Sequence, residues 1–305
     1  MNCSVIFWIS FLYLVGGLFG EVADEEVDWC DIEKKFCPQG TSHIACSGNA
    51  FGYGECEDLE VVEMSSRMKK MILLRHNYYR NLVAGGLLDG KPSASKMAQI
   101  HWDEKLEYLA RKHVEHCNFA HDGCRATDSW RIVGQNIALF ESKMDTGEPE
   151  EHLVAAVDLW FAEHFDATVN APFDQDVPTG HFLTMMLEGN HRMGCSMARY
   201  RTLRDEAIRY NYLITCDYSD ALVIGEDTYQ EGPPCSLCHT LGAHPSYIFD
   251  SLCDDQDNTI EEDSEDYSAT ECWKGSMKMV ERFKRTRSFV SITFFDVSWE
   301  KRCYL

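Results

Sequence analysis

Basic residues are scarce in this chain of 305 residues: 28 Lys and Arg stand against 50 Asp and Glu, for a formal net charge of −22. Proteins that bind nucleic acid follow its phosphates with a basic stripe or patch, and the sequence offers no such stripe. The same deficit argues against binding to anionic membrane surfaces. We therefore exclude nucleic acid as a partner.

Long apolar runs are equally scarce. After residue 20, no segment approaches the roughly 18 consecutive apolar residues of a transmembrane helix, so no transmembrane segment is expected. The run from Val5 to Phe19 is short for a membrane span and is followed at once by the acidic residues Glu21, Asp24 and Glu25. That order is typical of a cleaved signal peptide, here residues 1–20, and predicts a secreted, extracellular protein.

Signatures of covalent catalysis are missing too. The sequence shows no Ser-His-Asp or Cys-His nucleophile pattern, and its cysteines are expected to form disulfides. Cys235-Ser-Leu-Cys238 has the spacing of a zinc-ribbon pair, but no second pair of this kind follows. We therefore predict a disulfide cluster there rather than a zinc ribbon.

Cysteine, in contrast, is abundant: the chain has 14, and the loss of Cys3 with the signal peptide leaves 13. Paired thiols are the default in an oxidising compartment, yet an odd number cannot all pair within one chain. At least one cysteine is therefore a free thiol or the link of a disulfide-bonded dimer. We place it near the C-terminus and choose Cys303 from the five cysteines there, which are Cys235, Cys238, Cys253, Cys272 and Cys303.

Composition and turn signals divide the mature chain into three parts. Residues 21–60 are rich in Cys, Gly and Ser, which predicts a loop-rich, disulfide-stapled N-terminal arm. Residues 61–229 carry the regular patterns of the main domain, and Gly232-Pro233-Pro234 marks a C-terminal extension over residues 230–305. Within this extension, residues 254–266 are strongly acidic and are expected to form a solvated linker.

The main domain mixes helical and strand-like patterns. Helical periodicity begins at Glu63 and ends at Gly85, Asp103 is expected to cap a second helix, and Pro149 is expected to open a third. Strand-like segments cover residues 131–140, 192–200 and 211–218. Helices and strands mixed in this way predict an α+β layered domain.

The stretch from Thr179 to Leu187 places His181 between a glycine and an apolar run. Three other segments, residues 119–122, 134–136 and 160–163, are expected to converge on it. Two histidines and a carboxylate from separate segments can form a metal site or an acid–base site. The candidates are His121, His181 and Glu163.

The same residues also have a purely structural interpretation. His121 and His181 can brace the fold as a hydrogen-bonded pair without a metal, with Glu163 as the partner of an imidazole. Trp160 lies on the same helical face as Glu163 and is expected to be core. His76 and Asn77 are expected to serve packing and hydrogen bonding.

Six short motifs follow one another along the main domain: Leu74-Arg75-His76-Asn77-Tyr78-Tyr79-Arg80, His116-Cys117-Asn118-Phe119-Ala120-His121-Asp122-Gly123-Cys124, Val133-Gly134-Gln135-Asn136-Ile137-Ala138, Leu159-Trp160-Phe161-Ala162-Glu163, Thr179-Gly180-His181-Phe182 and Tyr212-Leu213-Ile214-Thr215-Cys216-Asp217-Tyr218. In this order they resemble the CAP superfamily of cysteine-rich secretory, antigen 5 and pathogenesis-related proteins. The match is closest to insect antigen 5 proteins of the venom or salivary allergen type.

The resemblance implies a three-layer α-β-α sandwich, the CAP fold, with a central cleft lined by two histidines and two acids. Matched residue by residue, the histidines are His121 and His181 and one acid is Glu163, while the second acidic position falls on Gln135. A glutamine can hydrogen-bond a water or a metal-bound ligand, but it cannot act as a base. The resemblance also implies four disulfides, the first three of which staple the arm to the segment that carries His121: Cys30–Cys46, Cys37–Cys124, Cys56–Cys117 and Cys195–Cys216.

Two functions from different classes remain. The first is a non-catalytic binding module that captures a small lipid, a divalent metal or an extracellular protein through the cleft. It requires no cofactor, and His121 and His181 would bind zinc only weakly. The second is a metal-assisted hydrolase or peptidase, in which Glu163 acts as the base. Because Gln135 replaces the second acid, we predict the binding module and not an enzyme.

Overall fold

The computed structural model describes residues 27–46, 51, 53–145, 148–170, 179–204 and 206–256. The predicted signal peptide at residues 1–20, the acidic segment beyond residue 256, Cys272 and Cys303 lie outside these ranges. Of the described helices, none is both long and apolar enough to cross a membrane.

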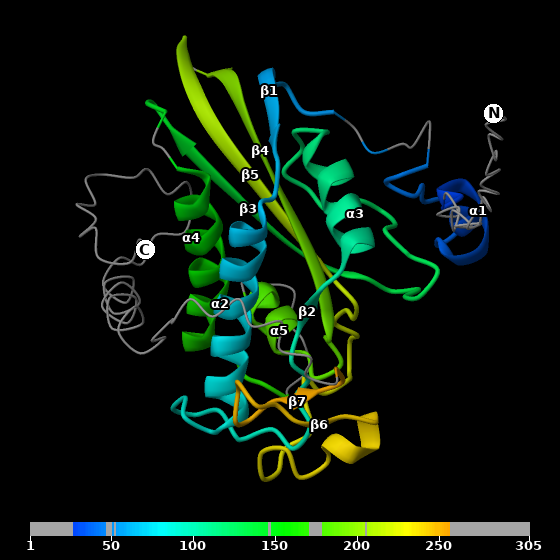
Figure 1. Ribbon diagram of the computed structural model, residues 1–305. Coiled ribbons are helices and arrows are strands. Elements are labelled where there is room, and N and C mark those ends of the chain that lie inside the picture. The colour runs from blue at the N-terminus through cyan, green and yellow to red at the C-terminus, as the bar shows by residue number, and fades with distance from the viewer. Residues whose placement is uncertain are drawn as a thin grey trace, which may run out of the picture.

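A mixed sheet forms the middle layer of the domain (Figure 1). Its strands follow the order β1-β4-β5-β3, and β2 pairs in parallel with β4. Helices α2, α4 and α5 cover one face and α3 covers the other. The predicted α+β, three-layer α-β-α sandwich is therefore confirmed. The elements are α1 (Trp29–Phe36), β1 (Glu57–Val62), α2 (Ser66–Ala84), β2 (His101–Trp102), α3 (Glu104–Val114), β3 (Gly134–Ser142), α4 (Pro149–Ala162), the 3-10 turn η1 (Glu163–Phe165), α5 (Gly180–Met186), β4 (Arg192–Arg204), β5 (Ala207–Tyr218), the 3-10 turn η2 (Cys238–Leu241), β6 (His244–Pro245) and β7 (Cys253–Asp254).

Side chains of β5 alternate between the two faces of the sheet, as an extended strand requires. Ile214 and Cys216 enter the core beneath α2, α4 and α5, whereas Leu213 packs with Val114 of α3. The sheet therefore separates two apolar layers. A charged residue on either face of this strand is an exception that needs a partner.

The helix boundaries follow the signals in the sequence. Asp103 caps α3, where its carboxylate accepts a hydrogen bond from the Leu106 N–H at 2.9 Å. Pro149 is the first residue of α4, and α2 ends at Ala84 with Gly85 as its C-cap. The predicted caps and the predicted end of the first long helix are confirmed.

Polar side chains of α2 serve the core. His76 is fully buried and contacts the Tyr218 hydroxyl at 2.9 Å, and Asn77 exchanges two hydrogen bonds of 2.8 Å with the backbone of Ile100. Trp160 is 2% exposed. The structural interpretation of His76, Asn77 and Trp160 is confirmed.

All four predicted disulfides form: Cys30–Cys46, Cys37–Cys124, Cys56–Cys117 and Cys195–Cys216. Two of them tie the N-terminal arm to Cys117 and Cys124, on either side of His121. Cys30–Cys46 instead closes a loop within the arm, so two of the first three bridges do the stapling, not all three. Each bridge is expected to contribute about 2–4 kcal/mol, mostly by restricting the unfolded chain.

The N-terminal arm is more regular than the predicted loop-rich segment. Its first described residues form α1, which Asp28 caps by accepting a hydrogen bond from the Asp31 N–H at 2.9 Å. Lys34 and Lys35 lie in its last turn, where the helix dipole favours cations. Near its end the arm forms strand β1, which joins the sheet by pairing with β4. This strand continues past residue 60, the predicted end of the arm. Helix α1 has 8 residues, which is too short for the helical spacing of its apolar residues to be recognised in a cysteine-rich segment.

The described part of the C-terminal extension packs onto the domain. β6 and β7 pair, and a β-bridge between Ala98 and Cys253 joins β7 to the segment before β2. Asp254, predicted to belong to a solvated linker, is instead 2% exposed. Its carboxylate lies 2.9 Å from Nε2 of His101, which compensates for the burial of the charge.

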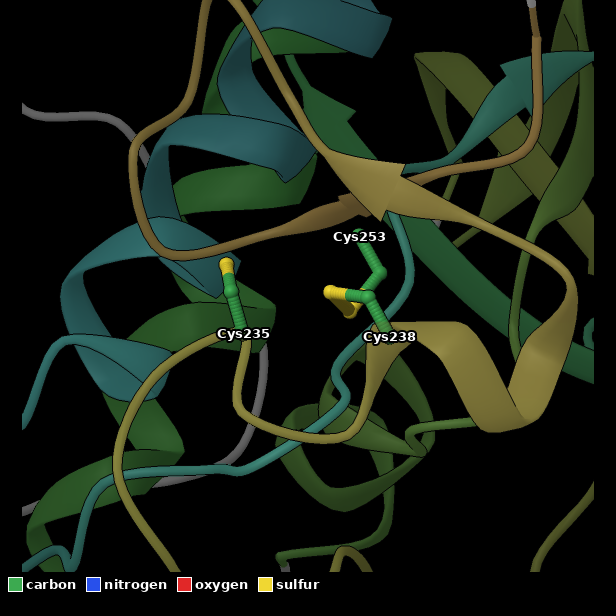
Figure 2. Close-up of side chains that lie close together, drawn as sticks. All are labelled: Cys235, Cys238 and Cys253. Carbon is green, nitrogen blue, oxygen red and sulfur yellow. A yellow bond between two sulfur atoms is a disulfide. The ribbon is translucent and has the colours of Figure 1, made fainter.

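Cys235 lies beside the Cys238–Cys253 disulfide and has no disulfide partner among the described cysteines (Figure 2). Its sulfur lies within 4.8 Å of both disulfide sulfurs. Burial, and then the charge of Asp250, raises the pKa of Cys235 above the ordinary 9.0. The expected disulfide cluster therefore forms, and within the described part of the chain Cys235 is its one cysteine without a disulfide.

We expect Cys235 to be alkylated in the folded, unreduced protein, slowly at neutral pH and faster in alkali, because the thiolate is the reactive form. Peptide mapping should find the label on Cys235 and an intact Cys238–Cys253 bridge. The Cys235→Ser variant should lose that label and keep the bridge. A native Cys235–Cys238 or Cys235–Cys253 bridge would contradict this assignment.

Candidate functional site

The candidate site is built around the first residues of β3, an edge strand of the sheet. Gln135 and Asn136 are neighbours in an extended strand, so their side chains leave on opposite faces. Gln135 contacts the His121 ring on one face, and Asn136 contacts the backbone carbonyl of His181 at 3.1 Å on the other. One end of a strand therefore positions histidines from two separate segments.

His121 lies in the loop after α3, between two cysteines that are both held in disulfides. Its Nδ1 lies 2.8 Å from Oε1 of Gln135. Gln135 is 8% exposed, whereas His121 is exposed. A buried side chain therefore orients an accessible imidazole.

The amide of Gln135 has a defined orientation. Its Nε2 lies 2.9 Å from Oδ2 of Asp122 and 3.0 Å from Oδ1 of Asp217, and an amide nitrogen has two hydrogens to donate. The amide oxygen therefore faces His121 and accepts a hydrogen bond, which requires the proton of the ring on Nδ1. In the neutral imidazole the lone pair is then on Nε2.

The two aspartates next to Gln135 differ in charge. Asp217 is fully buried, and this burial raises its pKa to about 8, so the neutral acid predominates at neutral pH. Burial acts on Asp122 in the same sense, but Arg125 contacts both of its oxygens, at 3.1 and 3.0 Å. The guanidinium outweighs burial and holds the pKa of Asp122 below its ordinary value. The buried pair therefore carries one negative charge, which Arg125 balances.

His181 is the second residue of α5 and is held in a similar way. Its Nδ1 lies 2.6 Å from Oε1 of Glu163, while Oε2 of Glu163 accepts the Phe182 N–H at 3.0 Å. Trp160 stacks on the imidazole, with ring centroids 6.0 Å apart. A carboxylate that faces Nδ1 requires a proton there, so neutral His181 also keeps its lone pair on Nε2.

The structure brings the four sequence-predicted residues together as two pairs, His121 with Gln135 and His181 with Glu163. Although the His121 residue is exposed, the protein around its ring removes enough water to lower the pKa of His121, and the charges of Arg125 and His181 lower it further. The His181 side chain is 36% exposed. Within the described ranges, neither histidine belongs to a group of three ligand residues whose ligand atoms lie within 4.8 Å of one another. An ion bound to this histidine pair would therefore need water as a further ligand.

Two cavities, of about 550 Å³ and about 180 Å³, lie elsewhere and share Glu188 and Asp227 in their walls. None of the four residues lines either cavity. The cleft that the resemblance implies is therefore neither of these two cavities. The two histidines are accessible to solvent away from both of them.

Asp217 is the member of this network that sequence interpretation did not single out. It is the cross-strand partner of Gln135 in the register of β3 and β5, so both side chains leave on the same face. A signal was present, because Asp217 is the one charged residue of the otherwise uncharged run from Tyr212 to Tyr218. An isolated acid in a buried strand indicates a hydrogen-bonded or protonated carboxyl group.

The sequence matches a family model and several named relatives. The family model described as "Cysteine-rich secretory protein family" (CAP) matches residues 73–218. "Venom allergen-1" of Aedes aegypti is 31% identical over 249 residues, which cover 80% of this chain and 91% of the relative. The chain belongs to the CAP family. "Antigen 5 like allergen Cul n 1" of Culicoides nubeculosus is 35% identical over 167 residues, which cover 52% of this chain and 74% of the relative.

The fold of this CAP protein also agrees with a solved structure. The crystal structure of hookworm platelet inhibitor superposes with a TM-score of 0.50 at 21% identity, and the match covers 65% of this chain and 96% of that one. At this identity the match shows the fold alone. The relatives named venom allergen and antigen 5 confirm the antigen 5-like assignment.

Proposed function

We propose that this CAP protein is secreted and acts as a non-catalytic binding module whose histidine pair, His121 and His181, holds zinc weakly. The observation that carries this function is the fixed tautomer of both rings. Gln135 and Glu163 each occupy an Nδ1 atom, so both imidazoles, when neutral, keep their Nε2 lone pairs. The venom allergens among its relatives and the predicted signal peptide support secretion.

The chemistry of the pair suits zinc. Metal-ligating histidines usually donate their second N–H to a carboxylate, an amide oxygen or water, which is the role that Glu163 and Gln135 fill here. Two imidazole nitrogens leave half of a tetrahedral shell to water or to an exogenous ligand. Bound zinc would supply an open Lewis-acid position there. Weak, exchangeable binding follows from having only two protein ligands.

The arrangement favours binding over hydrolysis. A general base needs a free lone pair within reach of a water. Both oxygens of Glu163 are used, one by His181 and one by the Phe182 N–H. Gln135 cannot accept a proton, and it already donates to two aspartates. These contacts support a binding role for the pair.

His121→Ala and His181→Ala should each lose the same bound zinc ion, and both should fold because the two side chains are accessible. Glu163→Gln should lower the affinity for that ion by about 10–100-fold. An amide cannot accept from both His181 Nδ1 and the Phe182 N–H, so one contact becomes repulsive or moves the ring proton to Nε2. Isothermal titration calorimetry with zinc near neutral pH measures these effects.

The matched control is His239→Ala, which removes an exposed histidine of η2 and should bind zinc as the wild type does. Affinity should fall below about pH 6, because protonation removes the lone pairs. The lowered pKa of His121 keeps that ring neutral to a lower pH than the ordinary 6.5. If both histidine variants bind as well as wild type, the pair only braces the fold.

A further inference from the structure

A second group of ligand side chains lies where the C-terminal extension meets the sheet. His101 of β2, Asp254 of β7 and Asp255 offer one nitrogen and two carboxylate oxygens, all within 4.8 Å of one another. We propose that these three residues form a second divalent-metal site, which takes zinc and clamps the extension to the domain. It is independent of the histidine pair at His121 and His181.

The distances fit an ion with little rearrangement. Nε2 of His101 lies 2.9 Å from Oδ1 of Asp254 and 3.9 Å from Oδ1 of Asp255. Ligand atoms at about 2.0–2.2 Å from a tetrahedral zinc stand about 3.3–3.6 Å apart. The two observed distances lie on either side of this range, so each changes by about half an ångström when zinc enters.

The two aspartates lie on the same side of the chain at the end of β7. Asp254 is the last residue of the strand and Asp255 lies just beyond it, where the side-chain alternation of an extended strand no longer applies, and their carboxylates lie 2.9 and 3.9 Å from Nε2 of His101. That nitrogen has at most one hydrogen and fully satisfies one acceptor. Asp255 has Arg192 as its partner, and a cation among the three atoms would be a ligand shared by both carboxylates and the imidazole.

Neighbouring groups hold the three ligands in place. Arg192, the partner of His101 in the β2–β4 register, contacts Oδ1 of Asp255 at 3.2 Å and Oδ2 at 3.1 Å. The Gln256 N–H donates to Oδ1 of Asp254 at 3.0 Å. A carboxylate offers about four lone-pair positions, so these bonds leave capacity for a metal. Such outer hydrogen bonds are the kind that orient metal ligands.

Charge and access also suit a cation. The two carboxylates and the Arg192 guanidinium leave one net negative charge while His101 is neutral. Asp254 is nearly buried at 3% side-chain exposure, but Asp255 is 33% exposed and gives solvent a route to the ion. Water can supply the fourth ligand. Bound zinc would then join β7 to β2, on the strand that also carries the disulfide of Cys253.

The test uses the full secreted chain and zinc alone. In a His181→Ala background, which removes the histidine pair, calorimetry should still find one bound equivalent, and zinc should raise the melting temperature. Adding His101→Gln should weaken that binding at least about tenfold. Glutamine keeps an N–H donor for Asp254 but is a poor zinc ligand. The substitution therefore preserves a hydrogen-bonded contact between β2 and the extension and removes a contact that depends on zinc.

Asp254→Asn in the same background should act like His101→Gln, and His239→Ala should change nothing. The proposal is overturned if His181→Ala binds no zinc, or if its remaining binding survives both His101→Gln and Asp254→Asn. In the second case His101 and Asp254 form only a hydrogen-bonded contact. Failure at the histidine pair is seen separately, as equal zinc binding by wild type and His181→Ala.

Discussion

Replacing Arg80 with methionine should lower the free energy of unfolding by on the order of 4 kcal/mol, since each buried acceptor left unpaired costs about 1–3 kcal/mol. The guanidinium is fully buried in the domain. It donates five hydrogen bonds of 2.6–3.1 Å to four backbone carbonyls, those of Ala98, Met185, Leu187 and Asn190. Methionine fills the space but donates nothing.

These carbonyls belong to three backbone segments, which the guanidinium ties together: the stretch before β2, the end of α5 and the turn before β4. Burial lowers the pKa of Arg80 to about 9, so the side chain is still charged at neutral pH. Lysine would keep the charge, but its single ammonium cannot span four acceptors in fixed directions. Arg80→Lys should therefore lose nearly as much stability as Arg80→Met.

Urea unfolding at neutral pH measures the loss. Arg67 lies on the same helix, α2, and is exposed, so Arg67→Met is the matched control and should stay within about 0.5 kcal/mol of wild type. A value for Arg80→Met within about 1 kcal/mol of wild type would show that water or other donors replace the guanidinium.

Local patterns in the sequence were sufficient for the elements that position the site. Asp103 marks a helix start by accepting a hydrogen bond from the N–H three residues on, and Pro149 does so through its fixed backbone angle, so both effects are local and readable without the fold. The strand-like pattern over residues 211–218 predicts the later part of β5, which begins at Ala207. The disulfide pairing came from the family resemblance, since spacing alone leaves many connectivities open.

Contacts between distant residues were not readable in the same way. Gln135 was identified by its motif, but its role depends on Asp217, which lies 82 positions away and becomes its neighbour only through the strand register. His101 and Asp254 are 153 positions apart, and the acidic run around Asp254 has the composition of a solvated linker. Composition describes a segment, whereas burial depends on what the rest of the chain places against it.

Asp217→Asn should be more stable than wild type at pH 8, and its stability should change less between about pH 4 and pH 8. In the folded protein, burial raises the pKa of Asp217 from the ordinary 3.8 to about 8. Below the ordinary value, both folded and unfolded chains hold the proton, and Asp217 contributes no pH dependence. Between the two values only the folded chain holds it, so stability falls as pH rises, by up to about 5 kcal/mol in total.

Asparagine resembles the neutral acid. Its Oδ1 can still accept from Gln135 Nε2, which Asp217 Oδ1 contacts at 3.0 Å, so the orientation of His121 is preserved. Oδ2 of Asp217 is buried with no hydrogen-bond partner among the described residues, and ionisation would place charge on it without compensation. The variant removes that ionisation without removing volume.

Asp122→Asn should instead destabilise the protein at neutral pH. Comparing the two variants therefore identifies which carboxyl group holds the proton. Asp122 has a lowered pKa, so its stabilising contribution is present above the ordinary 3.8 and is lost as pH falls through the lowered value. At neutral pH this variant leaves Arg125, whose side chain is 14% exposed, without its charge partner, and should cost about 3 kcal/mol. Urea unfolding of wild type and both variants, at several pH values from about 4 to 8, compares them. If Asp217→Asn is destabilised throughout and Asp122→Asn is not, the proton resides on Asp122, and the charge assignment next to Gln135 is reversed.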